Sequence, residues 1–177
     1  MKGIFSKRSL AIYLLFVLMI VAFTPAVMAK GNDVPGTYPT RPGVILVTPD
    51  KFGGVLPLGH AAIIRTSTTV VESTSKGVIM GANNWNHVKD NCYAVTVKTT
   101  TPLQDEQASV WCENQRYKPY NYNFFNTSTR SRFYCSQLIW AAFKDKYGID
   151  LNTSAFGNAI HPLELVTTPK TEIIFSK

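Results

Sequence analysis

Cys135 is the residue whose place in the sequence most favours chemistry. It lies in the segment RFYCSQL (132–138), where a loop rich in tyrosine, asparagine and phenylalanine gives way to a helical pattern. A thiol at a helix N-terminus lies at the positive end of the helix dipole and beside free backbone N–H groups, which favour the thiolate and can bind an oxyanion. The alternative is a buried structural cysteine, the commoner role when no base is near.

The base for such a nucleophile has to come from three histidines. His60 begins the apolar run 60–64, which predicts a strand that would hold the imidazole rigidly at the edge of a cleft. His87 lies in an asparagine-rich segment typical of a solvated loop, and His161 lies in a predicted turn. His60 is therefore the candidate base, although a lone histidine at a strand end is more often simply a polar terminus.

Glu72 is the acidic residue that could orient His60. It follows two valines in the run 69–72, where a carboxylate is unusual. An imidazole base works best when a third group fixes its tautomer and orientation. Because side chains alternate along strands, an odd-length turn would place Glu72 on the same face as His60, and a two-residue turn would place it on the opposite face. The sequence leaves this register open.

The order of these segments resembles that of a known family. The segments GHAAII (59–64), VVE (70–72) and YCSQLIW (134–140) resemble the NlpC-like papain-fold cysteine hydrolases. The likeness is greatest to the circularly permuted YiiX/YebB-like branch, which is related to the lecithin–retinol acyltransferases. In that branch, as here, the histidine precedes the cysteine and the glutamate comes twelve positions after the histidine. The resemblance covers about residues 42–175. It departs at Val44 and Gln137, where the family often has Asp and Glu.

This resemblance implies a Cys-His-Glu triad. Cys135 would be the nucleophile, and its backbone N–H would help to bind the oxyanion. His60 would be the general base and acid, and Glu72 would orient it. An aromatic groove for the substrate is also expected, with the side chains of Tyr120, Tyr122 and Tyr134 as its lining.

The resemblance also sorts the three cysteines. If Cys135 must stay reduced, Cys92 and Cys112 remain as a possible disulfide between a strand and the first predicted helix; the alternative is two separate buried thiols. The spacings CxxC and HxxxH do not occur in the sequence, so we expect no metal site and no cofactor.

Residues 1–29 predict a secretory signal peptide. Three basic residues precede the unbroken apolar stretch 10–23, and the residues at 27–29 suit a signal peptidase. The alternative is an uncleaved anchor, but the stretch is shorter than the ~20 residues that a membrane span requires. The sequence thus predicts a protein that is secreted or held in the cell envelope, with no stable membrane span after cleavage.

The rest of the chain predicts one domain. Beyond the leader, 15 basic residues face 11 acidic ones, and this mild, scattered excess does not indicate a nucleic-acid partner. Residues 30–42 predict an extended N-terminal arm, and residues 43–177 a single permuted papain-like catalytic domain. The expected partner is a peptide, amide or lipid substrate outside the cytoplasm, and the sequence does not predict an oligomeric state.

The predicted elements run from strands to helices. Strands are predicted over 44–48, 61–64, 69–72, 78–80, 92–97 and 171–175, helices over 101–115 and from 134 or 135 to 147, and a helical turn over 162–166, with a polar loop over 81–91. Such an order predicts an α+β fold in which an antiparallel sheet or small barrel packs against a few helices.

The function predicted from this combination is that of a secreted cysteine hydrolase. It would act as an amidase or peptidase through an acyl-enzyme, on cell-wall peptides or other extracytoplasmic amides. Two alternatives stay open: a lipid acyltransferase or phospholipid acyl hydrolase with the same triad, and a non-catalytic cell-wall-binding protein on the same fold.

Overall fold

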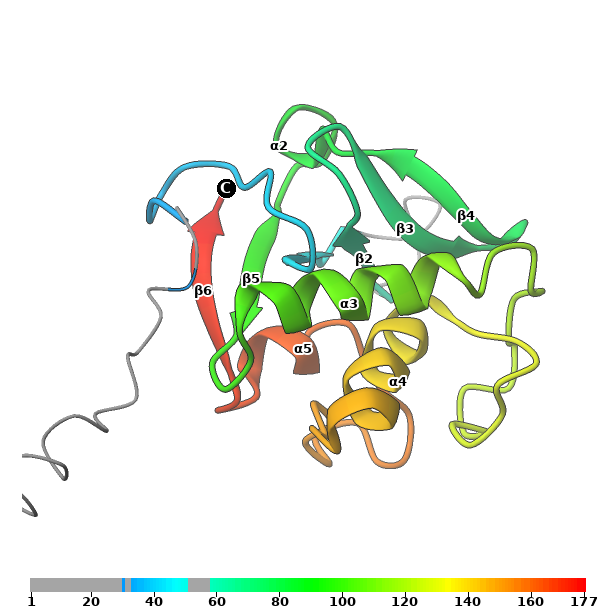
Figure 1. The fold of residues 1–177 in the computed structure, drawn as a ribbon. Coiled ribbons are helices and arrows are strands. Elements are labelled where there is room, and N and C mark those ends of the chain that lie inside the picture. Colours follow the sequence, from blue (N-terminus) through cyan, green and yellow to red (C-terminus); the bar gives the residue numbers. More distant parts are fainter. Residues whose placement is uncertain (1–29, 31–32, 51–57) are drawn as a thin grey trace, which may run out of the picture.

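The computed structural model describes residues 30, 33–50 and 58–177 (Figure 1). The predicted signal peptide lies outside the described residues. Within those ranges, no helix combines the length and the apolar character needed to cross a membrane.

One antiparallel sheet forms the centre of the described fold. Its order is β4-β3-β2-β1-β5-β6, so β1 lies inside the sheet although it comes first in the chain. The strands are β1 (Ile45–Thr48), β2 (His60–Ile64), β3 (Thr69–Thr74), β4 (Gly77–Ala82), β5 (Tyr93–Val97) and β6 (Thr171–Ser176). The predicted strands are thus found with small shifts at their ends, and the sheet is open rather than closed into a barrel.

Three helices lie on one face of this sheet (Figure 1). Helix α3 (Pro102–Glu113) begins with a capping box in which Thr101 and Gln104 bond each other's backbone N–H. Helix α4 (Cys135–Tyr147) ends at Gly148, whose φ of 68° gives the left-handed turn typical of a C-terminus. Helix α5 (Glu164–Thr167) is the predicted single turn.

The expected polar loop at 81–91 is wrong in its centre. Residues Trp85–Val88 form the short helix α2, and the end of β4 extends to Ala82. Trp85 is 3% exposed, and it buries its indole in the core on the sheet face opposite α3 and α4. The residues around Trp85 are polar and show no periodic apolar pattern, so the sequence did not indicate a helix here. The helix forms because burial of the large Trp85 side chain stabilises this one turn.

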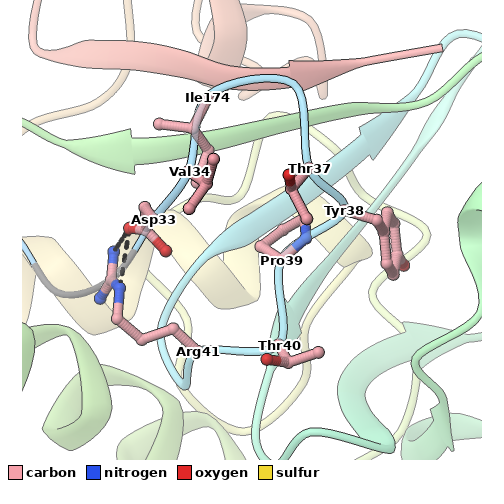
Figure 2. Close-up of a pocket in the computed structure, with 8 residues that line it drawn as sticks. All are labelled: Asp33, Val34, Thr37, Tyr38, Pro39, Thr40, Arg41 and Ile174. Atoms are coloured by element: carbon pink, nitrogen blue, oxygen red, sulfur yellow. Dashed lines mark hydrogen bonds and ion pairs between the residues drawn. The ribbon is translucent and has the colours of Figure 1, made fainter.

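The N-terminal arm packs against the sheet. Gly36 donates its N–H to the carbonyl of Ile174 on β6. Arg41 donates to the Asp33 carboxylate at 2.6 Å, as Figure 2 shows, and to the fully buried Asp105 of α3 at 2.8 Å. A buried carboxylate needs such partners, so this ion pair fixes the arm to the helix layer.

Candidate active site

Cys135 is the first residue of α4, as the sequence predicts. Its side chain is 6% exposed and lines a cavity of about 520 Å³. Burial opposes the thiolate, but the charge of His60, a hydrogen bond to that ring, and the backbone N–H groups of Ala61 and Ser136 outweigh it and lower the pKa of Cys135. The sulfur therefore lies where a helix N-terminus and a strand both stabilise its negative charge.

His60 begins β2, and the glycine before it sets its position. Gly59 has a φ of 62°, and a Cβ there would lie 2.8 Å from the carbonyl oxygen of Thr48. Burial disfavours the imidazolium, but the charge and hydrogen bond of Cys135, followed by those of Glu72, raise the pKa of His60 to about 9. Imidazolium and thiolate consequently stabilise each other in one cleft.

The structure resolves the register that the sequence left open. Strands β2 and β3 pair Ala62 with Glu72, and Arg65 with Thr69 closes a three-residue turn, so the turn has an odd length. Glu72 therefore shares a face with Ala62 and with His60, and its Oε2 lies 2.7 Å from Nε2 of the imidazole. Because Nε2 is bonded to Glu72, Nδ1 is the ring nitrogen left for the thiol.

Two of the three predicted groove tyrosines line the cavity. Tyr120 and Tyr122 meet edge to face, with ring centroids 4.9 Å apart, and form one wall together with Phe124. The expectation for Tyr134 is wrong. Tyr134 is 3% exposed, and its hydroxyl donates to the carbonyl of Phe124 and accepts from the N–H of Ile160. It therefore supports Phe124 without lining the cavity itself.

Leu58 and Gly59 also line the cavity. Hydroxyl-bearing and charged side chains make up much of the remaining lining. They are Thr48, Asp50, Ser73, Thr74, Ser75 and Lys89. The cavity thus offers both aromatic surface and hydrogen-bonding groups to whatever reaches the sulfur.

The expected disulfide between Cys92 and Cys112 is also wrong, because both cysteines are free and buried. Cys92 packs in the core beneath Trp85, whereas Cys112 packs between α3 and α4 on the other face of the sheet. Burial raises the pKa of Cys92 to about 11 and also raises that of Cys112. Neither thiol can bridge the other across the sheet, and neither is poised to react.

The two other histidines lie apart from Cys135 and Glu72. His87 is exposed on α2 and contacts the side chain of Asn86. His161 accepts a hydrogen bond from the N–H of Leu163 and stacks on Phe156, with centroids 3.9 Å apart. His60 is therefore the histidine that the described fold brings to Cys135.

Two further residues support the site, and neither role was predicted from the sequence. Trp85 stacks on the imidazole of His60, with ring centroids 5.6 Å apart and planes 25° from parallel. Gln137, fully buried, accepts from the N–H of Tyr134 through its amide oxygen and donates through its amide nitrogen to carbonyls of residues 126, 127 and 129. A tryptophan 25 positions from its partner follows no local pattern, whereas the N3 position of Gln137 could have been recognised as a cap.

Comparison with known proteins identifies the family. The family model for the permuted papain-like amidase enzyme, YaeF/YiiX, C92 family, matches residues 41–165. This chain belongs to the permuted papain-like amidases. Its α+β fold and its resemblance to the YiiX branch are thereby confirmed.

Two relatives illustrate the range of the permuted papain-like amidases. Uncharacterized protein YycO of Bacillus subtilis (strain 168) is 31% identical over 122 residues, which are 67% of this chain and 49% of that protein. The chain thus spans about half the length of this relative. The crystal structure of metalloprotein yiiX from Escherichia coli O157:H7 matches with a TM-score of 0.59 and 14% identity, covering 78% of this chain and 98% of that one. At that identity the match supports the fold alone.

The word metalloprotein belongs to the yiiX structure. In the part of this chain that the structure describes, no group of three or more His, Cys, Asp or Glu side chains is arranged to hold a metal ion. Among the described residues, we therefore assign none as metal ligands.

Proposed function

We propose that this chain hydrolyses an amide bond through the thiolate of Cys135. The observation that carries the proposal is the convergence of three groups in one cavity: a thiol at the start of α4, the imidazole of His60 bonded to it, and Glu72 on Nε2 of that imidazole at 2.7 Å. These are the nucleophile, base and orienting group of a cysteine hydrolase. The amidase family supplies the reaction class.

The reaction has two steps. The sulfur of Cys135 attacks the carbonyl carbon, and the negative oxygen that develops is held by backbone N–H groups at the start of α4, that of Cys135 among them. When the C–N bond breaks, His60 gives its proton to the leaving amine, and a thioester remains on the sulfur. Water, deprotonated by His60, then attacks the thioester, which releases the carboxylic acid and restores the thiol.

The proposed substrate is an amide outside the cytoplasm, such as a cell-wall peptide. Support comes from the predicted leader at residues 1–29. The cavity suits a substrate with both apolar and hydrogen-bonding parts, since aromatic rings and hydroxyl groups line it together. The same aromatic wall also suits an acyl chain, so hydrolysis or transfer of a lipid acyl group is the second candidate.

The test uses the purified protein with peptidoglycan fragments and, separately, with phospholipid vesicles. We expect release of amine and carboxylate from the fragments, and a thioester on Cys135 that mass spectrometry detects after acid quenching. Cys135→Ala and His60→Ala abolish both, while His87→Ala, an exposed histidine outside the cavity, keeps them. If product forms from phospholipid alone, the proposed amidase is wrong and the lipid acyl hydrolase or acyltransferase is favoured. Full activity in Cys135→Ala would refute both proposals.

A further inference from the structure

The N-terminal arm reaches the site through one hydroxyl group. Tyr38 of the arm donates to Oδ1 of Asn83 at 2.8 Å and accepts from the backbone N–H of Trp85 at 3.0 Å. Asn83 is held in turn by its own amide, which donates to the carbonyls of Pro39 and Ser67. One tyrosine hydroxyl thus joins the arm to the residue that begins α2.

The arm holds this tyrosine in a fixed place. The ring of Tyr38 packs edge to face against the ring of Phe175 on β6, with the ring centroids 5.3 Å apart. Figure 2 shows that the side chain of Tyr38 points away from the Asp33–Arg41 ion pair, which anchors the same arm. Burial raises the pKa of Tyr38 to about 12, so the hydroxyl keeps the proton that it donates. Both of its hydrogen bonds therefore persist across the working range of a cysteine hydrolase.

Helix α2 is too short to hold its own position. It has four residues, and its N-cap residue, Asn84, makes no side-chain cap. A single helical turn is unstable alone, so the contacts of Trp85 fix where it lies. Its indole packs on the face of His60 with centroids 5.6 Å apart, a distance at which an aromatic ring stabilises a cation.

We propose that Tyr38 and Trp85 are positioning residues for His60, and that the N-terminal arm is thereby part of the catalytic site. The hydroxyl of Tyr38 fixes the start of α2, and the indole of Trp85 then holds the imidazole plane and favours its charged form. This inference rests on the proposed function, in which His60 forms an ion pair with the nucleophile.

Other charged and titratable groups also face His60, and a test has to separate them. The groups are Glu72 on β3 and Cys135 on α4, together with the cavity residues Asp50, Lys89 and Tyr120. Substitutions at 38 or 85 replace none of these groups, but Trp85→Leu also removes the ring over which the Lys89 ammonium lies, 5.1 Å from its centroid. Because Tyr38→Phe keeps that ring, a shift of the pH profile shared by both variants reports the position of the indole.

The experiment is the rate of iodoacetamide alkylation of Cys135 as a function of pH, measured on the whole chain. Trp85→Leu should move the midpoint of thiolate formation upward by roughly 0.5 to 1 pH units, because the imidazolium loses its aromatic face. Trp85→Phe keeps a ring and should restore most of the profile. Tyr38→Phe should move the midpoint in the same direction as Trp85→Leu and lower kcat/KM about fivefold, the equivalent of one hydrogen bond.

Tyr147→Phe is the matched control. This substitution removes a partly buried hydroxyl, which donates to the carbonyl of Gln104 and so links α4 to α3. Tyr147 does not line the cavity. The substitution should cost stability without moving the alkylation profile. If Tyr38→Phe and Trp85→Leu likewise leave the profile unchanged while wild-type Cys135 reacts faster than a free thiol, the positioning role is refuted. If wild-type Cys135 reacts no faster than a free thiol, the proposed function itself fails.

Discussion

The carboxylate of Glu72 packs directly against the Cα of Gly81 on the neighbouring strand. Strand β4 pairs Ile79 with Glu72, so Gly81 is a diagonal neighbour on the same face. A Cβ at position 81 would overlap Oε1 of Glu72, while Oε2 is the atom bonded to His60. The absence of a side chain at Gly81 thus leaves room for the carboxylate in the orientation that reaches the imidazole.

Gly81→Ala should therefore lower kcat/KM, on the order of 100-fold, because the carboxylate must move away from His60. Steady-state kinetics on the amide substrate measures the effect. The same substitution made in a Glu72→Ala background should cost nothing further, since both changes act through one carboxylate. Additive losses in the double variant would show that Gly81 acts elsewhere.

Iodoacetamide should label Cys135 selectively in the folded protein near neutral pH. The pKa of this thiol is lowered by His60 and backbone donors, whereas burial raises the pKa values of Cys92 and Cys112. Peptide mass mapping after a brief reaction should find one adduct, and Cys135→Ala should give none. Equal labelling of the three cysteines under native conditions would contradict the assignment.

The pH profile of kcat/KM should be bell-shaped, with its alkaline limb near pH 9. Below the lowered pKa of Cys135 the thiol is protonated and activity falls; above about 9 His60 loses the proton that the leaving amine needs. Glu72→Gln removes a group that raises the His60 pKa, so the alkaline limb should move to lower pH. If the alkaline limb of the Glu72→Gln profile stays at the wild-type pH, Glu72 does not influence the proton transfer by His60.

Gln137→Glu should destabilise the fold and weaken the nucleophile. The amide nitrogen of Gln137 donates to the carbonyls of residues 126, 127 and 129, and a carboxylate oxygen in that place would face three acceptors. We expect a loss of about 1–3 kcal/mol in the free energy of unfolding. The added negative charge in the first turn of α4 should also shift Cys135 alkylation to higher pH.

Gln104→Glu provides the matched control for this change, because it alters the same N3 position on α3. There only the side-chain oxygen is used, accepting from the N–H of Thr101, and a carboxylate accepts equally well. Unfolding in urea should find this variant as stable as the wild type. An equal loss in the free energy of unfolding in the two variants would mean that the carbonyls around Gln137 are not the cause of the destabilisation.

Arg41→Met should destabilise the protein by about 3 kcal/mol, because it leaves the fully buried Asp105 short of its principal cation. Lys144→Met is the comparison: the Lys144–Asp150 pair is about 40% exposed on both sides, and its loss should cost no more than about 1 kcal/mol. Chemical denaturation measures both. Similar losses in the two variants would argue against the arm being anchored through Asp105.

Local sequence determined most of the elements and pointed to the candidate reactive residues. Alternating β-branched residues gave the strands, and Thr101 with Gln104 gave the start of α3. Cys135 at a loop-to-helix boundary and His60 at the head of a strand were recognisable because each sits at an element terminus that has its own local signature. The permuted order, histidine before cysteine, indicated the family that the comparison then confirmed.

Tertiary structure alone decided how these residues meet. Whether Glu72 faces His60 depends on the length of the turn between β2 and β3. The turn has three residues, and a turn one residue shorter would place the two side chains on opposite faces of the sheet. Whether Cys92 reaches Cys112 depends on which face of the sheet each occupies. Trp85 and Tyr38 join the site only when α2 and the arm fold over the sheet, because contacts across 25 and 47 positions leave no periodicity in the chain.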